Sequence, residues 1–176
     1  RADSLRRPPD FFHARGVLEV ETPVMINAPV SDVNLESVRA LVPGREAPLF
    51  LHTSPEYAMK RLLAAGSGDI FQICHVFRGS ERGRQHNPEF TMLEWYRLGF
   101  SLEDLMHEVG TLVRGLLGTE GLPVEMLTYR DAVQRHAGFD PLEAPDSQLR
   151  GAARDLGLSS DDANRATRDV LLDLIV

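Results

Sequence analysis

The sequence contains a single cysteine, Cys74, so no disulfide can form within the chain, which fits a reducing compartment. It also contains no apolar run of about 18 residues, the length that a membrane-spanning helix requires. Its first residues do not follow the pattern of a secretory signal peptide. From these absences we expect a soluble cytoplasmic protein without a membrane partner.

The sequence has fewer positively than negatively charged side chains. Nineteen Lys and Arg residues stand against 26 Asp and Glu, which gives a formal net charge of −7. A protein that coats nucleic acid needs a basic surface to neutralise phosphates, so this function is disfavoured. A local basic patch remains compatible with the sequence, because Arg78, Arg82, Arg84 and His86 lie in one short stretch.

Several common functional motifs are missing. The sequence has no GxxxxGK[ST] or GxGxxG phosphate loop and no GxSxG nucleophile motif. Its six histidines do not show the spacing of metal ligands, and no second cysteine is present, so we expect no zinc site and no metal ligands in these residues. A bound nucleotide would therefore be held by arginine and aromatic side chains. The chain ends in an apolar run, residues 171–176, without a helix stop signal, which we interpret as a sign of a longer protein.

The most informative stretch covers residues 69–97. Two runs of alternating character, residues 70–78 and 89–97, are joined by a charged loop that contains glycine. Alternation at period two predicts strands, and the short connection predicts an antiparallel hairpin. One face of the first strand carries Gln72, Cys74, Val76 and Arg78, and one face of the second carries Phe90, Met92, Glu94 and Tyr96. If these faces coincide, they form one polar floor.

Helices and further strands are expected around this hairpin. A helix should begin at Pro8-Pro9, bury Phe11 and Phe12, and end at Gly16. We expect short strands at residues 17–21 and 49–52, with one or two more within residues 24–48. The other expected helices are residues 55–65 with Ser54 as N-cap and Pro55 first, residues 102–117 between Ser101 and Gly118, residues 128–137, residues 146–157 and residues 167–176.

These elements predict an α+β fold, in which helices flank an antiparallel sheet and a small helical segment follows. A chain of 176 residues suits one domain with a small appendage. We place the catalytic core at residues 1–125 and the helical segment at residues 126–176.

Each candidate residue also has an ordinary structural explanation. Arg78 would be a surface arginine at a strand end, and Glu56 would compensate the dipole of a helix first turn. Phe90 and Tyr96 would be core aromatics. Glu94 is harder to explain in this way, because a carboxylate in mid-strand is costly to bury unless a cation or hydrogen-bond donors face it. A ligand ammonium or a protein arginine would meet that demand.

The chain resembles the catalytic domain of class II aminoacyl-tRNA synthetases, in the lysyl branch. Residues 11–23 are similar to motif 1 of that class, and residues 77–96 are similar to motif 2. Residues 53–56 and 60–62 match the lysyl subgroup between the two motifs. Within this branch the chain is most similar to the short paralogues that ligate (R)-β-lysine to elongation factor P.

The resemblance implies a role for each matching residue on the ATP side. Arg78 would be the catalytic residue, because it would hold both the substrate carboxylate and the ATP α-phosphate and stabilise charge as the adenylate forms. Phe90 would stack on adenine. The implied ATP-binding residues are Arg78, Gly79, Ser80, His86, Asn87 and Phe90.

On the amino-acid side, the resemblance implies that Glu56, with Ser54 near it, binds the amino group close to the substrate carboxylate. Tyr96 would help to recognise the distal ammonium, and Glu94 would shape the floor. The implied substrate-binding residues are Ser54, Pro55, Glu56, Glu94 and Tyr96. The implied cofactors are ATP and Mg2+, and the implied substrate is lysine or β-lysine.

The sequence departs from the family pattern in three places. Ser80 stands where family members usually carry a glutamate, with Glu81 next to it. Pro8-Pro9 shortens the motif 1 helix, which in this class contributes to a homodimer interface. Motif 3 and its ATP-binding arginine, together with the magnesium-binding carboxylates, have no match in the 176 residues, so these residues alone should be inactive.

Three functions remain open from the sequence. The first is an ATP-dependent ligase that transfers (R)-β-lysine, or lysine, to a lysine side chain of elongation factor P. The second is a lysyl-tRNA synthetase catalytic domain that charges tRNA-lysine. The third is a non-catalytic paralogue that binds an amino acid or adenylate, a hypothesis to which Ser80 gives some support.

Overall fold

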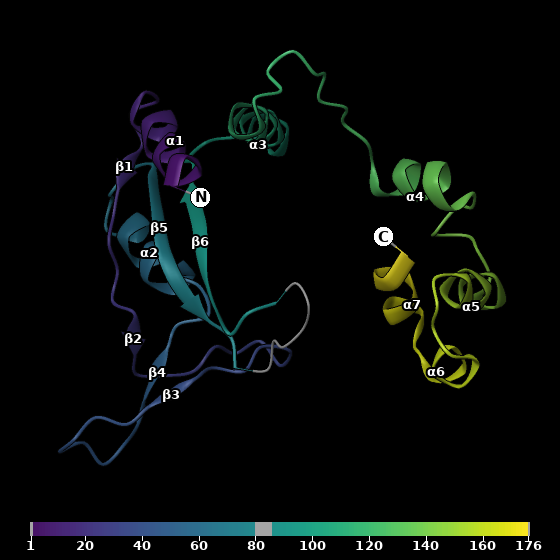
Figure 1. Ribbon diagram of the computed structural model, residues 1–176, viewed down its shortest axis with the longest axis horizontal. Helices are drawn as coiled ribbons and strands as arrows, with labels where there is room; N and C mark the ends of the chain where they lie inside the picture. Colours follow the sequence, from purple (N-terminus) through teal and green to yellow (C-terminus); the bar gives the residue numbers. More distant parts are fainter. Residues whose placement is uncertain (1, 80–85, 176) are drawn as a thin grey trace. The chain divides into compact units, whose positions relative to one another are not determined.

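The computed structural model describes residues 2–79 and 86–175 (Figure 1). The chain forms two compact units, residues 1–122 and residues 123–176. Across the described ranges, no helix is both long and apolar enough to cross a membrane.

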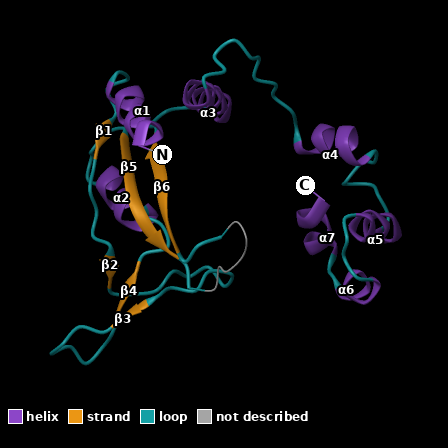
Figure 2. Cartoon of the chain, in the orientation of Figure 1, coloured by secondary structure: helices purple, strands orange, loops and turns teal. Residues whose placement is uncertain are grey.

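The centre of the first unit is the hairpin of β5 (Ile70–Phe77) and β6 (Glu89–Tyr96) (Figure 2). The strands pair antiparallel, with Gln72 opposite Glu94 and Val76 opposite Phe90. Since opposite residues of a ladder point to the same side, the two polar faces coincide, which was the condition for a single polar floor. The backbone N–H of Arg78 donates to the carbonyl of Pro88 over 2.9 Å and extends the pairing past the end of β5.

The pairing of the other strands was only partly predicted. The short strand β1 (Leu18–Glu19) lies at the other side of β5 and runs parallel to it, so the sheet β1-β5-β6 is mixed rather than wholly antiparallel. A second, antiparallel sheet consists of β2 (Met25–Ile26), β4 (Leu49–Leu51) and β3 (Arg39–Ala40), in that spatial order.

The first helix, α1 (Ala2–His13), corrects a prediction, because it continues through Pro8 and Pro9 instead of beginning there. Proline lacks the N–H that an interior helical residue donates, so the helix forgoes two backbone hydrogen bonds. Pro8 is nevertheless buried, and this burial favours the helical path. The end of the helix agrees with the prediction: Gly16 has a φ of 71°, and the N–H of Val17 reaches back to the carbonyl of Phe12.

The helix α2 (Glu56–Ala64) begins one position later than expected, with Pro55 rather than Ser54 as its N-cap. The Ser54 hydroxyl still accepts a hydrogen bond from the Glu56 N–H over 3.1 Å. It therefore stabilises the backbone turn into the helix, while its own proton is free to be donated elsewhere. Met59, on the inner side of the helix, is fully buried.

The longest helix, α3 (Leu102–Leu117), has the predicted ends. Ser101 and Asp104 form a capping box, and Gly118 takes the left-handed conformation at the C-cap. Leu112 packs into a core with Phe12, Val17 and Phe71, behind the hairpin. Within this core the rings of Phe12 and Phe71 are stacked, with their centroids 4.8 Å apart.

The second unit contains four short helices around a core of its own. They are α4 (Tyr129–Ala137), α5 (Asp146–Asp155), α6 (Ser160–Arg165) and α7 (Arg168–Ile175). Their core consists of Val133, Phe139, Ala144, Leu149, Ala153 and Leu171. Helix α6 was not predicted, although Ser159 caps it by accepting from the Asp162 N–H.

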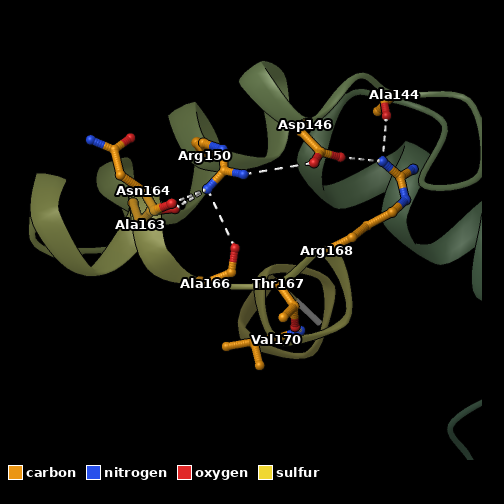
Figure 3. A network of polar contacts seen from close by, with 9 residues as sticks. All are labelled: Ala144, Asp146, Arg150, Ala163, Asn164, Ala166, Thr167, Arg168 and Val170. Carbon is orange, nitrogen blue, oxygen red and sulfur yellow. Dashed lines mark hydrogen bonds and ion pairs between the residues drawn. The ribbon is translucent and has the colours of Figure 1, made fainter.

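Two arginines join the helices of this unit (Figure 3). Arg150 Nη1 donates to the carbonyls of Ala163, Asn164 and Ala166 at the end of α6. Arg168 donates to the carbonyl of Ala144 and to Asp146 at the start of α5. These bonds give partners to carbonyls that a helix end or a loop leaves without one.

Candidate active site

The floor expected from the sequence is present on one face of the hairpin. The pairs Ile70–Tyr96, Gln72–Glu94, Cys74–Met92 and Val76–Phe90 follow one another along it. Val76 is fully buried, whereas Phe90, Glu94 and Tyr96 are only half-buried. On β5, Ile70 and Gln72 are buried as well, so it is the β6 side of the floor that is open enough to meet a ligand.

Two hydrogen bonds hold the side chain of Glu94 on this floor. Its Oε2 accepts a hydrogen bond of 2.5 Å from the Ser54 hydroxyl, and its Oε1 accepts one of 2.7 Å from the Tyr96 hydroxyl. Hydrogen bonds to an ionised carboxylate are among the stronger ones in proteins. Each carboxylate oxygen retains a further lone pair, so the group can still accept from an ammonium.

Tyr96 is held in its protonated form. Partial burial, followed by the hydrogen bond to Glu94 and the negative charges of Glu94 and Glu56, raises the pKa of its phenol well above the ordinary value of 10.0. The phenol therefore stays a donor to Glu94 at physiological pH.

Glu56 lies at the start of α2, two residues after Ser54. Its Oε1 is 2.5 Å from the Nζ of Lys60, one helical turn further on, and both side chains are about half exposed. This contact, by hydrogen bond and by charge, raises the pKa of the Lys60 ammonium. A small cavity of about 30 Å3 is lined by Ile26, Val30, Thr53, Ser54, Glu56 and Tyr57. That volume suits a water molecule or an ammonium group.

Arg78 lies at the other end of the floor. Its Nε donates to the carbonyl of Thr53 over 3.4 Å, and its guanidinium carbon is 5.2 Å from the centroid of the Phe90 ring. Arg78 is engaged in further interaction beside these two. A cation and an aromatic face at this distance attract each other, so each side chain helps to orient the other.

The residues 53–56 connect these groups. The carbonyl of Thr53 accepts from Arg78, the hydroxyl of Ser54 donates to Glu94, and Glu56 follows at the helix start. The segment 53–56 thus contacts Arg78, which follows β5, and Glu94 of β6, and it ends with Glu56 at the start of α2.

The remaining expected residues lie differently. Gly79 lies beside Arg78, and its N–H donates to the carbonyl of Glu36 over 2.8 Å. His86 and Asn87 are exposed. Pro55 is fully buried at the start of α2, and its role in substrate binding stays a prediction. Ser80 lies outside the described residues.

A wider hollow of about 620 Å3 lies along β5, next to the segment that follows β1. It is lined by Glu19, Val20, Glu21, Thr22, Val24, Gln72, Ile73, Cys74 and His75. It shares Gln72 and Cys74 with the floor but none of Ser54, Glu56, Arg78, Glu94 or Tyr96. We place the candidate site at the latter residues, because hydrogen-bonded charges converge there.

Of the two implied cofactors, the described residues offer suitable groups for ATP but no cluster of ligands for magnesium. A guanidinium beside an aromatic ring has the chemistry to hold a phosphate and a base, so Arg78 and Phe90 suit ATP. For magnesium, residues 2–79 and 86–175 offer no cluster of three or more His, Cys, Asp or Glu side chains.

Sequence reasoning missed two features of the site. The Lys60–Glu56 pair has the i,i+4 spacing that brings opposite charges together on a helix, so it was detectable in the sequence. The contact of Arg78 with the Thr53 carbonyl was not, because it depends on how β4 and β5 are placed in three dimensions.

Comparison with known proteins identifies the family of the chain. The family model for class II tRNA synthetases (D, K and N) matches residues 1–163. An elongation factor P–(R)-β-lysine ligase from Erwinia tasmaniensis is 54% identical over 170 residues, covering 94% of this chain and 51% of the relative. Proteins of the same name from Salmonella paratyphi B and Salmonella heidelberg are each 51% identical over 169 residues, with the same coverage.

The chain spans about half the length of the curated relatives it matches. The family match, by contrast, extends over most of the chain and includes every residue of the candidate site. The chain therefore belongs to the class II tRNA synthetase family of the D, K and N type.

Proposed function

We propose that the whole protein activates (R)-β-lysine with ATP and transfers it to a lysine side chain of elongation factor P. The observation that carries this proposal is the segment 53–56, which joins Arg78, Glu94 and Glu56 into one constellation. The names of the relatives support the choice of substrate and acceptor.

The charges of this constellation match the charges of the substrate. (R)-β-Lysine carries one carboxylate and two ammonium groups, and the constellation offers one guanidinium and two carboxylates. Glu94, held by Ser54 and Tyr96, would accept the distal ammonium, and Glu56, beside the 30 Å3 cavity, would accept the ammonium near the carboxylate. Arg78 would bind the carboxylate through its guanidinium.

The ATP side of the proposal rests on Arg78 and Phe90. Phe90 would stack on the adenine, and Arg78 would hold the α-phosphate next to the substrate carboxylate. Gly79, Ser80, His86 and Asn87 stay predictions as further ATP contacts. Magnesium stays a predicted cofactor of the whole protein.

The chemistry requires positioning and charge stabilisation rather than a protein nucleophile. A carboxylate oxygen of β-lysine forms a bond to the α-phosphorus of ATP, while the bond from that phosphorus to the β-phosphate oxygen breaks and pyrophosphate leaves. The amine of the acceptor lysine then attacks the carbonyl carbon of the adenylate, AMP leaves, and the amine proton passes to solvent. Arg78 would stabilise the negative charge that develops in the first step.

Three further parts of this account stay predictions: the boundary between a core at residues 1–125 and a helical segment at residues 126–176, a homodimer, and a cytoplasmic location. The predicted boundary at residue 125 is close to the division between the two compact units, which falls after Leu122.

The test uses the full-length protein with ATP, magnesium and (R)-β-lysine. Elongation factor P and tRNA-lysine are offered in separate reactions, and each is repeated with α-lysine. Intact-mass spectrometry reads the modification of the factor, and an acid gel reads charging of the tRNA. We expect a mass gain on the factor with (R)-β-lysine and no charged tRNA.

Two other outcomes would replace the proposal. Charging of tRNA, best with α-lysine, would identify a lysyl-tRNA synthetase. Binding of the amino acid without release of pyrophosphate would identify a non-catalytic paralogue. In that case Ser80→Glu would be the first substitution to test, because Ser80 stands at the position of a family glutamate.

A further inference from the structure

A network of charged side chains lies on the reverse face of β6, behind the candidate site. Trp95 Nε1 donates to Glu108 Oε2 over 3.0 Å, which ties the strand to α3. Arg97 Nε lies 3.3 Å from Glu108 Oε1, and Arg97 Nη1 lies 3.0 Å from Asp69 Oδ2. Asp69 Oδ1 in turn accepts from the N–H of Leu98 over 2.7 Å. Together these contacts join the start of β5, the end of β6 and the middle of α3.

The charges of this network are buried to an unusual degree. The side chain of Arg97 is 10% exposed and that of Glu108 is 6% exposed. Charged residues rarely take such positions unless they are paired. The Arg97 contacts are close enough for ion pairing, yet Nε and Nη1 do not reach hydrogen-bond geometry with any partner among the described residues. The guanidinium is also 4.4 Å from the centroid of the Phe100 ring.

Burying a carboxylate at residue 108 costs desolvation free energy that an apolar contact between helix and sheet would not. The position belongs to the inner side of α3, where Leu112 packs against Phe12 and Phe71. An apolar side chain there would pack without the cost of desolvating a charge, and buried ion pairs are weak contributors to stability for this reason. The contacts of Glu108 are directional, however, and they fix two side chains of the same strand edge.

Side chains of an extended strand alternate between its faces. Glu94 and Tyr96 point to the floor, whereas Trp95 points to the reverse face, and Arg97 follows Tyr96 on that side. Rotation or sliding of this strand end would move all four side chains together. Fixing Trp95 and Arg97 behind the sheet therefore fixes Glu94 and Tyr96 in front of it.

We propose that Glu108 and Arg97 are positioning residues, which act through Trp95 and the end of β6 to hold Glu94 and Tyr96 where they receive the ammonium of the amino-acid substrate. This inference rests on the proposed function for the identity of that substrate. It assigns no contact with substrate or ATP to Glu108 or Arg97.

The kinetic test is ATP–pyrophosphate exchange by the full-length protein with (R)-β-lysine. The variants are Glu108→Gln, Arg97→Gln and the double variant. We expect KM for (R)-β-lysine to rise about tenfold in each, which corresponds to about 1.4 kcal/mol of lost binding. KM for ATP should change less than about twofold, because Arg78 and Phe90 lie at the other end of the hairpin.

The double variant separates positioning from stability. Each single substitution breaks the buried Glu108–Arg97 pair and leaves its other charge without that partner, although Arg97 keeps Asp69 in Glu108→Gln, so each should lower the urea midpoint. The double variant removes both charges of the pair and leaves only the more exposed Asp69 carboxylate without Arg97, so it should recover part of the loss. We expect KM for (R)-β-lysine to stay raised in the double variant. Recovery of both the urea midpoint and this KM, or an equal rise of KM for ATP, would overturn the proposal. Glu103→Gln, an exposed carboxylate on the same helix, is the matched control.

A second readout does not depend on activity. In protein labelled with 13C in its tyrosine rings, the Tyr96 signal is assigned by Tyr96→Phe. We expect Glu108→Gln to shift this signal and Glu103→Gln to leave it in place. An unmoved Tyr96 signal would overturn the inference whatever the enzymatic activity. Absence of ATP–pyrophosphate exchange in the wild type would instead overturn the proposed function, and the Tyr96 signal could still be interpreted.

Discussion

Ser54 and Glu94 are 40 positions apart in the sequence and are joined by a hydrogen bond of 2.5 Å. The same serine hydroxyl accepts from the N–H of Glu56, so it connects the start of α2 with the middle of β6. The hydroxyl thus serves as a hydrogen-bond donor to Glu94 and as an acceptor for Glu56. This explains why Ser54 belongs to the site and does not simply cap a helix.

The first prediction concerns this hydroxyl. Ser54→Ala removes one of the two donors to Glu94, and a hydrogen bond to a charged group contributes about 1.5–3 kcal/mol. We expect KM for the amino acid to rise about tenfold or more and KM for ATP to stay within about twofold, as measured by pyrophosphate exchange. Ser67→Ala, just after α2, is the control, because within residues 2–79 and 86–175 its hydroxyl bonds only the neighbouring Gly68 carbonyl. Equal changes in both KM values would show that Ser54 acts through the fold as a whole.

The second prediction is a pH dependence. The folded protein raises the pKa of Tyr96 above the ordinary value of 10.0, so it keeps a proton that the unfolded chain loses as pH rises past about 10. This contribution to the free energy of unfolding is complete below pH 10 and declines above it. The stability difference between wild type and Tyr96→Phe should therefore shrink as pH rises from about 10 to about 12 in urea unfolding. A constant difference over that range would contradict the raised pKa.

The third prediction concerns Lys60, whose ammonium occupies the Glu56 carboxylate. If a substrate ammonium uses the same carboxylate, Lys60 competes with it. Lys60→Met should then lower KM for the amino acid about two- to threefold at low salt, the scale of an exposed ion pair, and the effect should fade as salt increases. Arg61→Met removes the same charge from the next, exposed residue and serves as the control. A raised KM would instead mean that Lys60 orients Glu56.

The fourth prediction concerns the second unit. Arg150 Nη1 donates to three carbonyls at the end of α6, and Arg150→Met would leave all three without this partner. We expect a loss of about 2 kcal/mol in local stability. Amide hydrogen exchange should accelerate in residues 160–166. Arg154→Met, at an exposed position of α5, the helix that carries Arg150, should not accelerate this exchange. Unchanged exchange in both variants would show that the helix packing alone holds α6.

Local patterns in the sequence predicted the elements around the site well. Alternation over residues 70–78 and 89–97 predicted both strands, which the structure has as Ile70–Phe77 and Glu89–Tyr96, and the faces that carry Glu94 and Tyr96. Ser101 and Gly118 predicted the two ends of α3, and the structure adds that Ser101 and Asp104, three residues apart, form a capping box at its start. The same spacing at Ser159 and Asp162 marks α6, but a helix of six residues is too short to show a hydrophobic period.

The features that escaped prediction depend on contacts between distant segments. The parallel pairing of β1 with β5 joins Leu18 to Ile70, and no local pattern specifies such a partner. The path of α1 through two prolines contradicts local preference and depends on the burial of Pro8. Glu108 interrupts the apolar side of α3, where its burial becomes understandable only once Trp95 and Arg97 are known to face it.

The register of the hairpin limits how this protein can change during evolution. Because Gln72 faces Glu94 and Phe71 faces Trp95, a single-residue deletion inside β6 would exchange the two faces of the strand beyond it. The carboxylate and phenol would then enter the core, and the tryptophan would enter the site. Substitutions in β6 can be accepted one side chain at a time, but insertions and deletions there would destroy the core and the chemistry in the same event.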